Sequence, residues 1–229
     1  MAGNNESLSW KFYFLNIILL GSFLAVVEVG LGGSIKKTGL PLRGPLVTGV
    51  GFAVMALGLA IFKQARVIPG ITVMGIFSKW LAVPLLGLPI FCQANSLLAI
   101  LLNGAFLYSG VVFLKQKVAK GWPQRSAVAA IAAFGAGTAF FILGRFVAPC
   151  RHLLSFKYAS GVSAYMLTRI VPAALLAAVF FPLGYALGRK LEKRLLPMWL
   201  ARKPLLVPLA GAFTLACLGL TILLTAAGF

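Results

Sequence analysis

The stretch LGSFLAVVEVGLGGSI, from Leu20 to Ile35, is apolar almost throughout and carries one charged residue, Glu28, near its middle. Together with the residues from Phe12 onwards, it is long enough to cross the hydrocarbon core of a bilayer, which takes about 20 residues of helix. The whole chain of 229 residues is 61% hydrophobic, whereas soluble domains are about half apolar. Its apolar runs are continuous and do not alternate with a period of two, which disfavours a transmembrane barrel.

These observations predict an all-α fold, a polytopic transmembrane helical bundle of about six to seven spans, with residues 1–229 forming a single integral-membrane domain. The apolar residues divide into seven segments, whose expected bounds are Phe12–Ile35, Pro45–Phe62, Pro69–Phe91, Ser96–Leu114, Ala127–Ala148, Ala164–Leu187 and Leu205–Ala227. Pro84 and Pro89 lie in the third segment, and we expect them to kink, break or end its helix.

The net charge is +18, because 21 Lys and Arg residues stand against three acidic residues. Basic residues gather after the second, fourth and sixth segments, and such residues accumulate on the cytoplasmic side of a membrane. We therefore predict a multi-pass protein of the cell (cytoplasmic) membrane with a cytoplasmic N-terminus. Membrane lipids are the expected partners of the basic loops. Nucleic acid is not expected, because no recognition helix or zinc module stands apart from the spans.

Residues for hydrolytic chemistry are nearly absent. The chain has no Asp, its single histidine is His152, and its three cysteines form no C-x-x-C pair. Neither a zinc-protease motif nor a phosphate-binding loop occurs, and no second carboxylate accompanies Glu28 within a span. We expect no catalytic residue, no metal site and no cofactor.

Glu28 is the first candidate binding residue, because an ionisable side chain within a span is costly and normally faces a cavity or a partner. One interpretation is a structural ion pair with Lys79 or Arg145, both of which also lie in predicted spans. The other is a group that contacts a ligand or an ion, and the spacing does not decide between them. For Lys79 itself, the favoured interpretation is snorkelling to the membrane interface.

Three further residues are candidates for a substrate-binding site. Asn95 is expected to be the N-cap of the fourth helix, and Asn103 lies two turns further along a roughly adjacent face. An amide within a membrane needs partners, so Asn103 either joins two helices or contacts a ligand, the former being favoured. Arg145 lies near the end of the fifth segment. With Lys36, Lys37, Arg43, Arg151 and His152 it either meets headgroups or forms an electropositive mouth that attracts an anionic solute.

One region resembles a known family. The stretch LPLRGPLVTGVGFAVMALGLAIFKQARVIPGITVMGIFSKWLAVPLL and the following ANSLLAILLNGAFLY, together Leu40–Tyr108, resemble the integral-membrane substrate-binding (S) components of energy-coupling-factor transporters. The shared features are a basic residue and Gly at the start of the second span, a G-x-x-x-K pattern in the third, and the AIL phrase in the fourth. The family's first span carries small residues spaced by four, which here are Gly21 and Ala25, followed by the larger Val29.

The resemblance implies a protein that binds a small solute, of vitamin or precursor type, and has no energy source of its own. Its partners would be a coupling transmembrane subunit, docked on Gly21 and Ala25, and two ATPases. The members of this family commonly have six spans, and the metal-binding signature of the cobalt and nickel members is missing here. Two alternatives come from other classes: a membrane scaffold or assembly factor that transports nothing, and, more weakly, a lipid-modifying enzyme.

Overall fold

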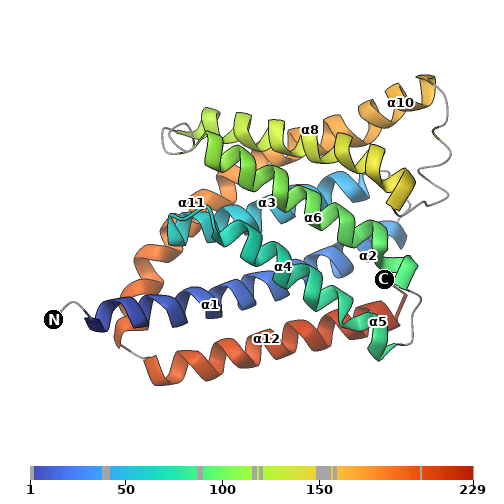
Figure 1. Cartoon of the computed structure of the whole chain (residues 1–229). Helices are drawn as coiled ribbons and strands as arrows, with labels where there is room; N and C mark the ends of the chain where they lie inside the picture. Colours follow the sequence, from blue (N-terminus) through green and yellow to red (C-terminus); the bar gives the residue numbers. More distant parts are fainter. Residues whose placement is uncertain are drawn as a thin grey trace.

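The computed structural model of the chain describes residues 3–37, 42–86, 90–114, 118, 121–147, 156, 159–201 and 203–228, and within these ranges the regular structure is entirely helical (Figure 1). The helices are α1 (Gly3–Val26), α2 (Gly32–Lys37), α3 (Arg43–Phe62), α4 (Val67–Trp80), α5 (Ala82–Leu85), α6 (Ile90–Phe113), α8 (Trp122–Val147), α10 (Ala159–Tyr165), α11 (Val171–Ala201) and α12 (Lys203–Ala226). Two π-helical segments, η1 (Val27–Leu31) and η2 (Met166–Ile170), connect α1 to α2 and α10 to α11.

Among the described residues, seven helical stretches are long and apolar enough to cross a membrane. They are Tyr13–Ile35, Arg43–Phe62, Val67–Leu85, Ala94–Phe113, Trp122–Val147, Gly161–Arg194 and Pro208–Ala226. The prediction of an all-α polytopic bundle is confirmed, and all seven predicted segments correspond to one of these helices. Because the number of spans is odd, the two ends of the chain lie at opposite ends of the bundle (Figure 1).

Six spans form a ring around the interior. Along this ring α1 contacts α4, α4 contacts α6, α6 contacts α8, α8 contacts α11, and α11 contacts α3, which returns to α1. The seventh, α12, lies outside the ring against α1 (Figure 1). The interior is filled by large buried side chains, among them Phe52 and Met55 of α3, Ile71 of α4, Leu107 of α6 and Phe181 of α11.

Two spans, the first and the sixth, each contain a π-helical segment between two α-helical parts. In the sixth span η2 ends two residues before Pro172, whose missing N–H leaves one carbonyl of the preceding turn without a helical partner. The backbone adapts with a wider turn, in which the N–H of Val171 donates to the carbonyl of Met166, five residues back. In the first span η1 contains Glu28.

The expected break in the third span is confirmed on the side of Pro84. Helix α4 ends at Trp80, Leu81 forms a turn, and the short α5 contains Pro84. Pro89 lies outside the described residues. The break after Trp80 is caused by Pro84, which has no backbone N–H to donate and whose ring crowds the preceding turn.

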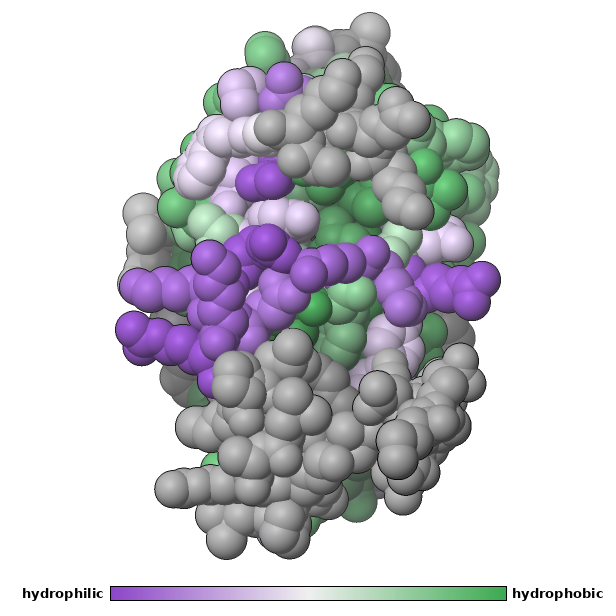
Figure 2. Space-filling model, turned by 90° about the vertical axis from the view of Figure 1, so that its left-hand side faces the viewer, coloured by the Kyte–Doolittle hydropathy of each residue, from purple (hydrophilic) through white to green (hydrophobic). Residues whose placement is uncertain are grey.

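Basic side chains gather at one end of the bundle, where the connections after α3, α6 and α11 lie. Figure 2 shows a hydrophilic band across this end. We call it the basic end; its described cations are Lys63, Arg66, Arg125, Arg189, Lys190, Lys193 and Arg194. Glu192 pairs with Lys63 at 2.7 Å and with Arg189 at 2.8 Å, so most of the positive charge there is left for headgroups or a partner.

Small residues bring the backbones of α3 and α11 into close contact. A Cβ at Gly184 would lie 2.7 Å from the Cα of Ala53, and one at Gly188 would lie 2.6 Å from the carbonyl oxygen of Leu57. Lipid supplies no hydrophobic force to hold two helices together, so association depends on such close backbone packing.

We predict that Gly184→Ala destabilises the protein, because the new methyl group would meet the backbone of α3, which moves only if the helices separate. The expected loss is about 1–3 kcal/mol, read as a lower melting temperature in mild detergent. Gly219→Ala is the matched control, because nothing lies within 4 Å of a Cβ there, and it should be neutral or stabilising. Equal effects of the two substitutions would contradict this account of the α3–α11 contact.

Candidate functional site

Glu28 lies at the centre of a polar network that joins three spans. Its Oε1 accepts a hydrogen bond from Ser96 Oγ of α6 at 2.7 Å, and Lys79 Nζ of α4 lies 3.4 Å from the same oxygen. The ammonium group of Lys79 also donates to Ser96 Oγ. Each of the three polar groups therefore contacts the other two.

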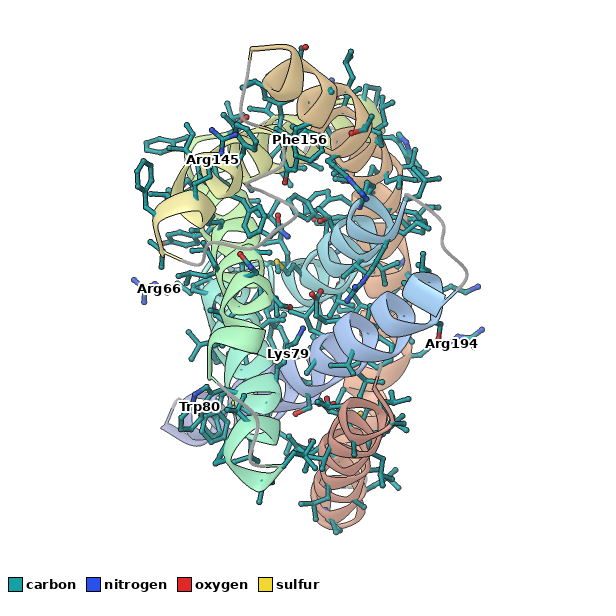
Figure 3. The ribbon with its side chains drawn as sticks, turned by 90° about the vertical axis from the view of Figure 1, so that its right-hand side faces the viewer. Arg66, Lys79, Trp80, Arg145, Phe156 and Arg194 are labelled. Carbon is teal, nitrogen blue, oxygen red and sulfur yellow. The ribbon has the colours of Figure 1, made fainter. Side chains whose placement is uncertain are left out.

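This network is largely removed from solvent. The side chain of Lys79 is 7% exposed and that of Glu28 is 18% exposed. Figure 3, viewed along the bundle from the end that bears α2 and α5, shows Lys79 in the interior among the ends of α1, α4 and α6. A single charge at such a depth costs at least a few kcal/mol, and the opposite charge with its hydrogen bonds offsets part of that cost.

The favoured sequence interpretation of Lys79 was wrong. Snorkelling requires an ammonium group that reaches the interface, whereas Lys79 is buried and turns inward to Glu28. The physical reason is that a carboxylate stands at the same depth on a neighbouring span. Of the two partners considered for Glu28, the structure selects Lys79.

A close approach of α1 and α4 brings Glu28 and Lys79 within reach of each other. A Cβ at Gly21 would meet the side chain of Met74 and lie 3.0 Å from the carbonyl oxygen of Ile71, so only glycine fits this contact. Two buried hydroxyls, of Ser22 and Ser78, meet across the same interface at 3.4 Å.

Gly21 and Ala25, which the resemblance implies as docking residues, are therefore both enclosed in the bundle. Ala25 has no exposed surface, and Gly21 packs on α4. A coupling subunit would reach them only after α1 had separated from its neighbours.

A small pocket adjoins the network between α1, α3 and α6. Its polar lining groups are Glu28 and Asn103, and its apolar walls include Leu24, Val47, Phe52 and Ile100. The pocket offers about 10 Å³ to the centre of a water molecule, which is the room of about one water. In this conformation it holds no solute of vitamin size, but it places one carboxylate and one amide against a common apolar wall.

Asn95 and Arg145 are not among the residues that line this pocket. The expectation that Asn95 caps the fourth helix was wrong, because α6 begins at Ile90 and Asn95 lies within it. The helix already includes the five residues before Asn95, among them the apolar Ile90, Phe91 and Cys92. Asn95 Oδ1 is buried and finds no hydrogen-bond partner within the described part of the chain.

Arg145 belongs to a separate cluster at the end of α8. Its guanidinium group lies 4.1 Å from the centre of the Phe141 ring and donates to the carbonyl oxygen of Phe156. Figure 3 shows Arg145 and Phe156 together, away from Lys79. Arg145 thus ties the segment after α8 to that helix and does not line the pocket beside Glu28. Arg151 and His152, and the side chains of Lys36 and Lys37, lie outside the described residues.

Two residues of this region were not singled out as binding residues. Ser96 is uncharged, and a single hydroxyl in an apolar segment carries no pattern that marks it as a binding residue. Arg43 was considered only with the outer basic residues, yet its guanidinium group lies beside Gly32, one turn beyond Glu28. The sequence feature that could have identified Arg43 is its position as the first residue of α3, the span that lines the pocket together with Glu28.

Comparison of the chain with known protein families, with curated proteins and with solved structures gives no match. The function is therefore argued from the site alone.

We predict that Glu28→Gln and Lys79→Met each destabilise the protein by about 3 kcal/mol, because each leaves the partner charge unpaired at depth. The double variant E28Q/K79M should recover most of that loss, since it removes both charges together. Melting temperatures in detergent measure all three. Additive losses in the double variant would show that the two side chains do not act as a pair.

Proposed function

We propose that this protein is the solute-binding component of a membrane uptake system for a small solute of vitamin or precursor type, powered by partner ATPases. The observation that carries the proposal is the network of Glu28, Lys79 and Ser96, buried in the ring of spans and open on one side to the pocket that Asn103 lines. Polar groups that converge from several helices on an apolar pocket are typical of ligand sites. Ionisable groups within a membrane usually mark a solute or ion pathway.

The chain itself supplies binding and not energy. Its sequence contains no phosphate-binding loop, so nucleotide hydrolysis of that type would belong to separate subunits. A coupling transmembrane subunit would transmit the conformational change that this hydrolysis drives. In the proposed cycle the solute enters from the end opposite the basic end, and the bundle then reorients to release it.

Binding requires the spans to move. The pocket has room for about one water, so α1 or α6 must shift outward before a larger solute fits. The π-helical η1 next to the pocket is a suitable place for that movement, because π-helical turns are rare and occur frequently at functional sites.

The proposed orientation places the basic end in the cytoplasm, because positive residues accumulate there. The N-terminus would then be cytoplasmic and the C-terminus outside, in the cytoplasmic membrane. Lipid headgroups of the inner leaflet would contact the exposed cations, which include Lys190, Lys193 and Arg194.

We predict that alkaline phosphatase fused after Phe229 is active in cells, because it needs export to fold. The same enzyme inserted after Gln64, at the basic end, should be inactive. Green fluorescent protein at the two positions should give the reverse pattern. An inactive C-terminal phosphatase together with a fluorescent C-terminal fusion would show that the C-terminus is cytoplasmic, which contradicts the proposed orientation.

A second candidate, a membrane scaffold or assembly factor, is favoured by one observation. The network satisfies its own charges and the pocket is nearly filled, which is also what a purely structural ion pair requires. The two candidates differ in what Asn103 does, because a scaffold has no solute for it to contact.

We predict that Asn103→Leu abolishes the co-purification of a small molecule with the protein and changes the free energy of unfolding by no more than about 0.5 kcal/mol, as for a substitution that removes no packing. Mass spectrometry of extracts from protein purified in mild detergent measures the loss. Thr138→Val on α8, whose hydroxyl bonds only the carbonyl of Phe134, is the control and should retain the molecule.

Affinity purification from native membranes separates the two candidates. The proposed function requires a coupling membrane subunit and ATPases among the recovered proteins. Recovery of the chain without any ATPase, and without a bound small molecule, would favour the scaffold.

A further inference from the structure

The charges around the pocket do not balance. Glu28 contributes one negative charge and Lys79 one positive charge, and the two are paired. Arg43 adds a second positive charge beside Gly32, four residues after Glu28. Arg43 forms no ion pair with a carboxylate in the described part of the chain. The described side chains at this end of the pocket therefore carry one unbalanced positive charge.

The fold places Arg43 close to the residues that line the pocket. Arg43 begins α3, and Val47, one turn along the same face, lines the pocket. Both side chains pack beside Gly32: a Cβ at Gly32 would lie 3.5 Å from Arg43 Nε and 3.5 Å from Val47 Cγ2. Because Gly32 lies four residues after Glu28 on the same continuous helix, the guanidinium group stands one turn above the carboxylate. It is exposed and remains free to bind.

The rest of the pocket specifies the remainder of the ligand. Its walls are apolar apart from the amide of Asn103 and the Glu28 carboxylate, which already has two donors. A guanidinium group matches the two oxygens of a carboxylate with parallel hydrogen bonds. An apolar body would lie against Val47 and Ile100, and Asn103 would meet one polar group of that body.

We infer that the site binds a water-soluble monocarboxylate with an apolar body, its carboxylate on Arg43 at the mouth and near Lys79, and its body between α3 and α6. This assignment rests on the proposed function and adds the chemical class of the solute. A monoanion brings the charge of the site to zero. A cationic solute would increase the unbalanced positive charge, and a neutral solute would leave that charge uncompensated.

The test uses the full-length protein in detergent and three probes of one shape: cyclohexanecarboxylate, cyclohexanecarboxamide and cyclohexylammonium. Each is added at equal concentration and ionic strength, with inorganic phosphate as a fourth arm. The carboxylate should raise the melting temperature by about 2–4 °C at saturation. The amide, the ammonium compound and phosphate should leave it unchanged.

Variants locate the binding. Arg43→Gln should weaken carboxylate binding at least about tenfold, and Arg43→Lys should restore it in part, because the charge returns without the planar fork. Since Arg43 is exposed, neither substitution threatens the fold. Arg66→Gln, an exposed cation at the basic end, is the matched control and should bind like the original protein.

The inference would be overturned by no shift with the carboxylate, by equal shifts with carboxylate and amide, or by a carboxylate shift that survives Arg43→Gln. A shift with the ammonium probe that disappears in Asn103→Leu would overturn the monocarboxylate while leaving a solute-binding function in place. Loss of the proposed function is read separately, from the absence of ATPases in the affinity purification.

Discussion

A charged pair held inside an apolar bundle constrains the placement of the helices around it. Glu28, Lys79 and Ser96 come from three spans, and each satisfies the other two. In lipid no water replaces a missing partner, so α1, α4 and α6 must keep their relative positions for the charges to remain paired. The glycine contacts serve this requirement: Gly21 lets α1 approach α4, and Gly104 leaves room for Thr72 between α4 and α6.

The π-helical turn at η1 explains how one span serves two neighbours. Each extra residue in a turn rotates the following face by about 100°. Before the turn, Gly21 faces Met74 and Ile71 of α4; after it, Gly32 faces Arg43 and Val47 of α3. Glu28 lies within the turn, between the two faces, where its carboxylate meets Lys79 and also lines the pocket on the α3 side. A regular helix would present its small residues to one neighbour along its whole length.

The sequence predicted the spans well and the neighbours poorly, for a physical reason. Span length follows from bilayer thickness, so seven apolar runs gave seven helices. Helix order around the ring depends on close contacts such as those of Gly184, which no periodicity in uniformly apolar segments reveals. Glu28 was therefore identified as important while its partner stayed open between Lys79 and Arg145. Lys79 was misplaced because its burial depends on a carboxylate from another span. Ser96 was missed because a hydroxyl in an apolar run has no distinctive pattern.

Charge balance is the physical argument that favours a binding site over a purely structural ion pair. An ion pair that only joins helices is electrically neutral. Replacing such a buried pair by well-packed apolar side chains often leaves the stability unchanged or raises it. Around this pocket the pair is neutral but its surroundings are not, because Arg43 stands above Glu28 with no carboxylate of its own among the described residues. A guanidinium group at the lipid interface is unremarkable when it points to headgroups. Arg43 instead packs beside Gly32 and one turn from Val47, where the side chains that line the pocket begin. On the proposed function, the anionic solute would supply the negative charge that the described side chains around Arg43 lack.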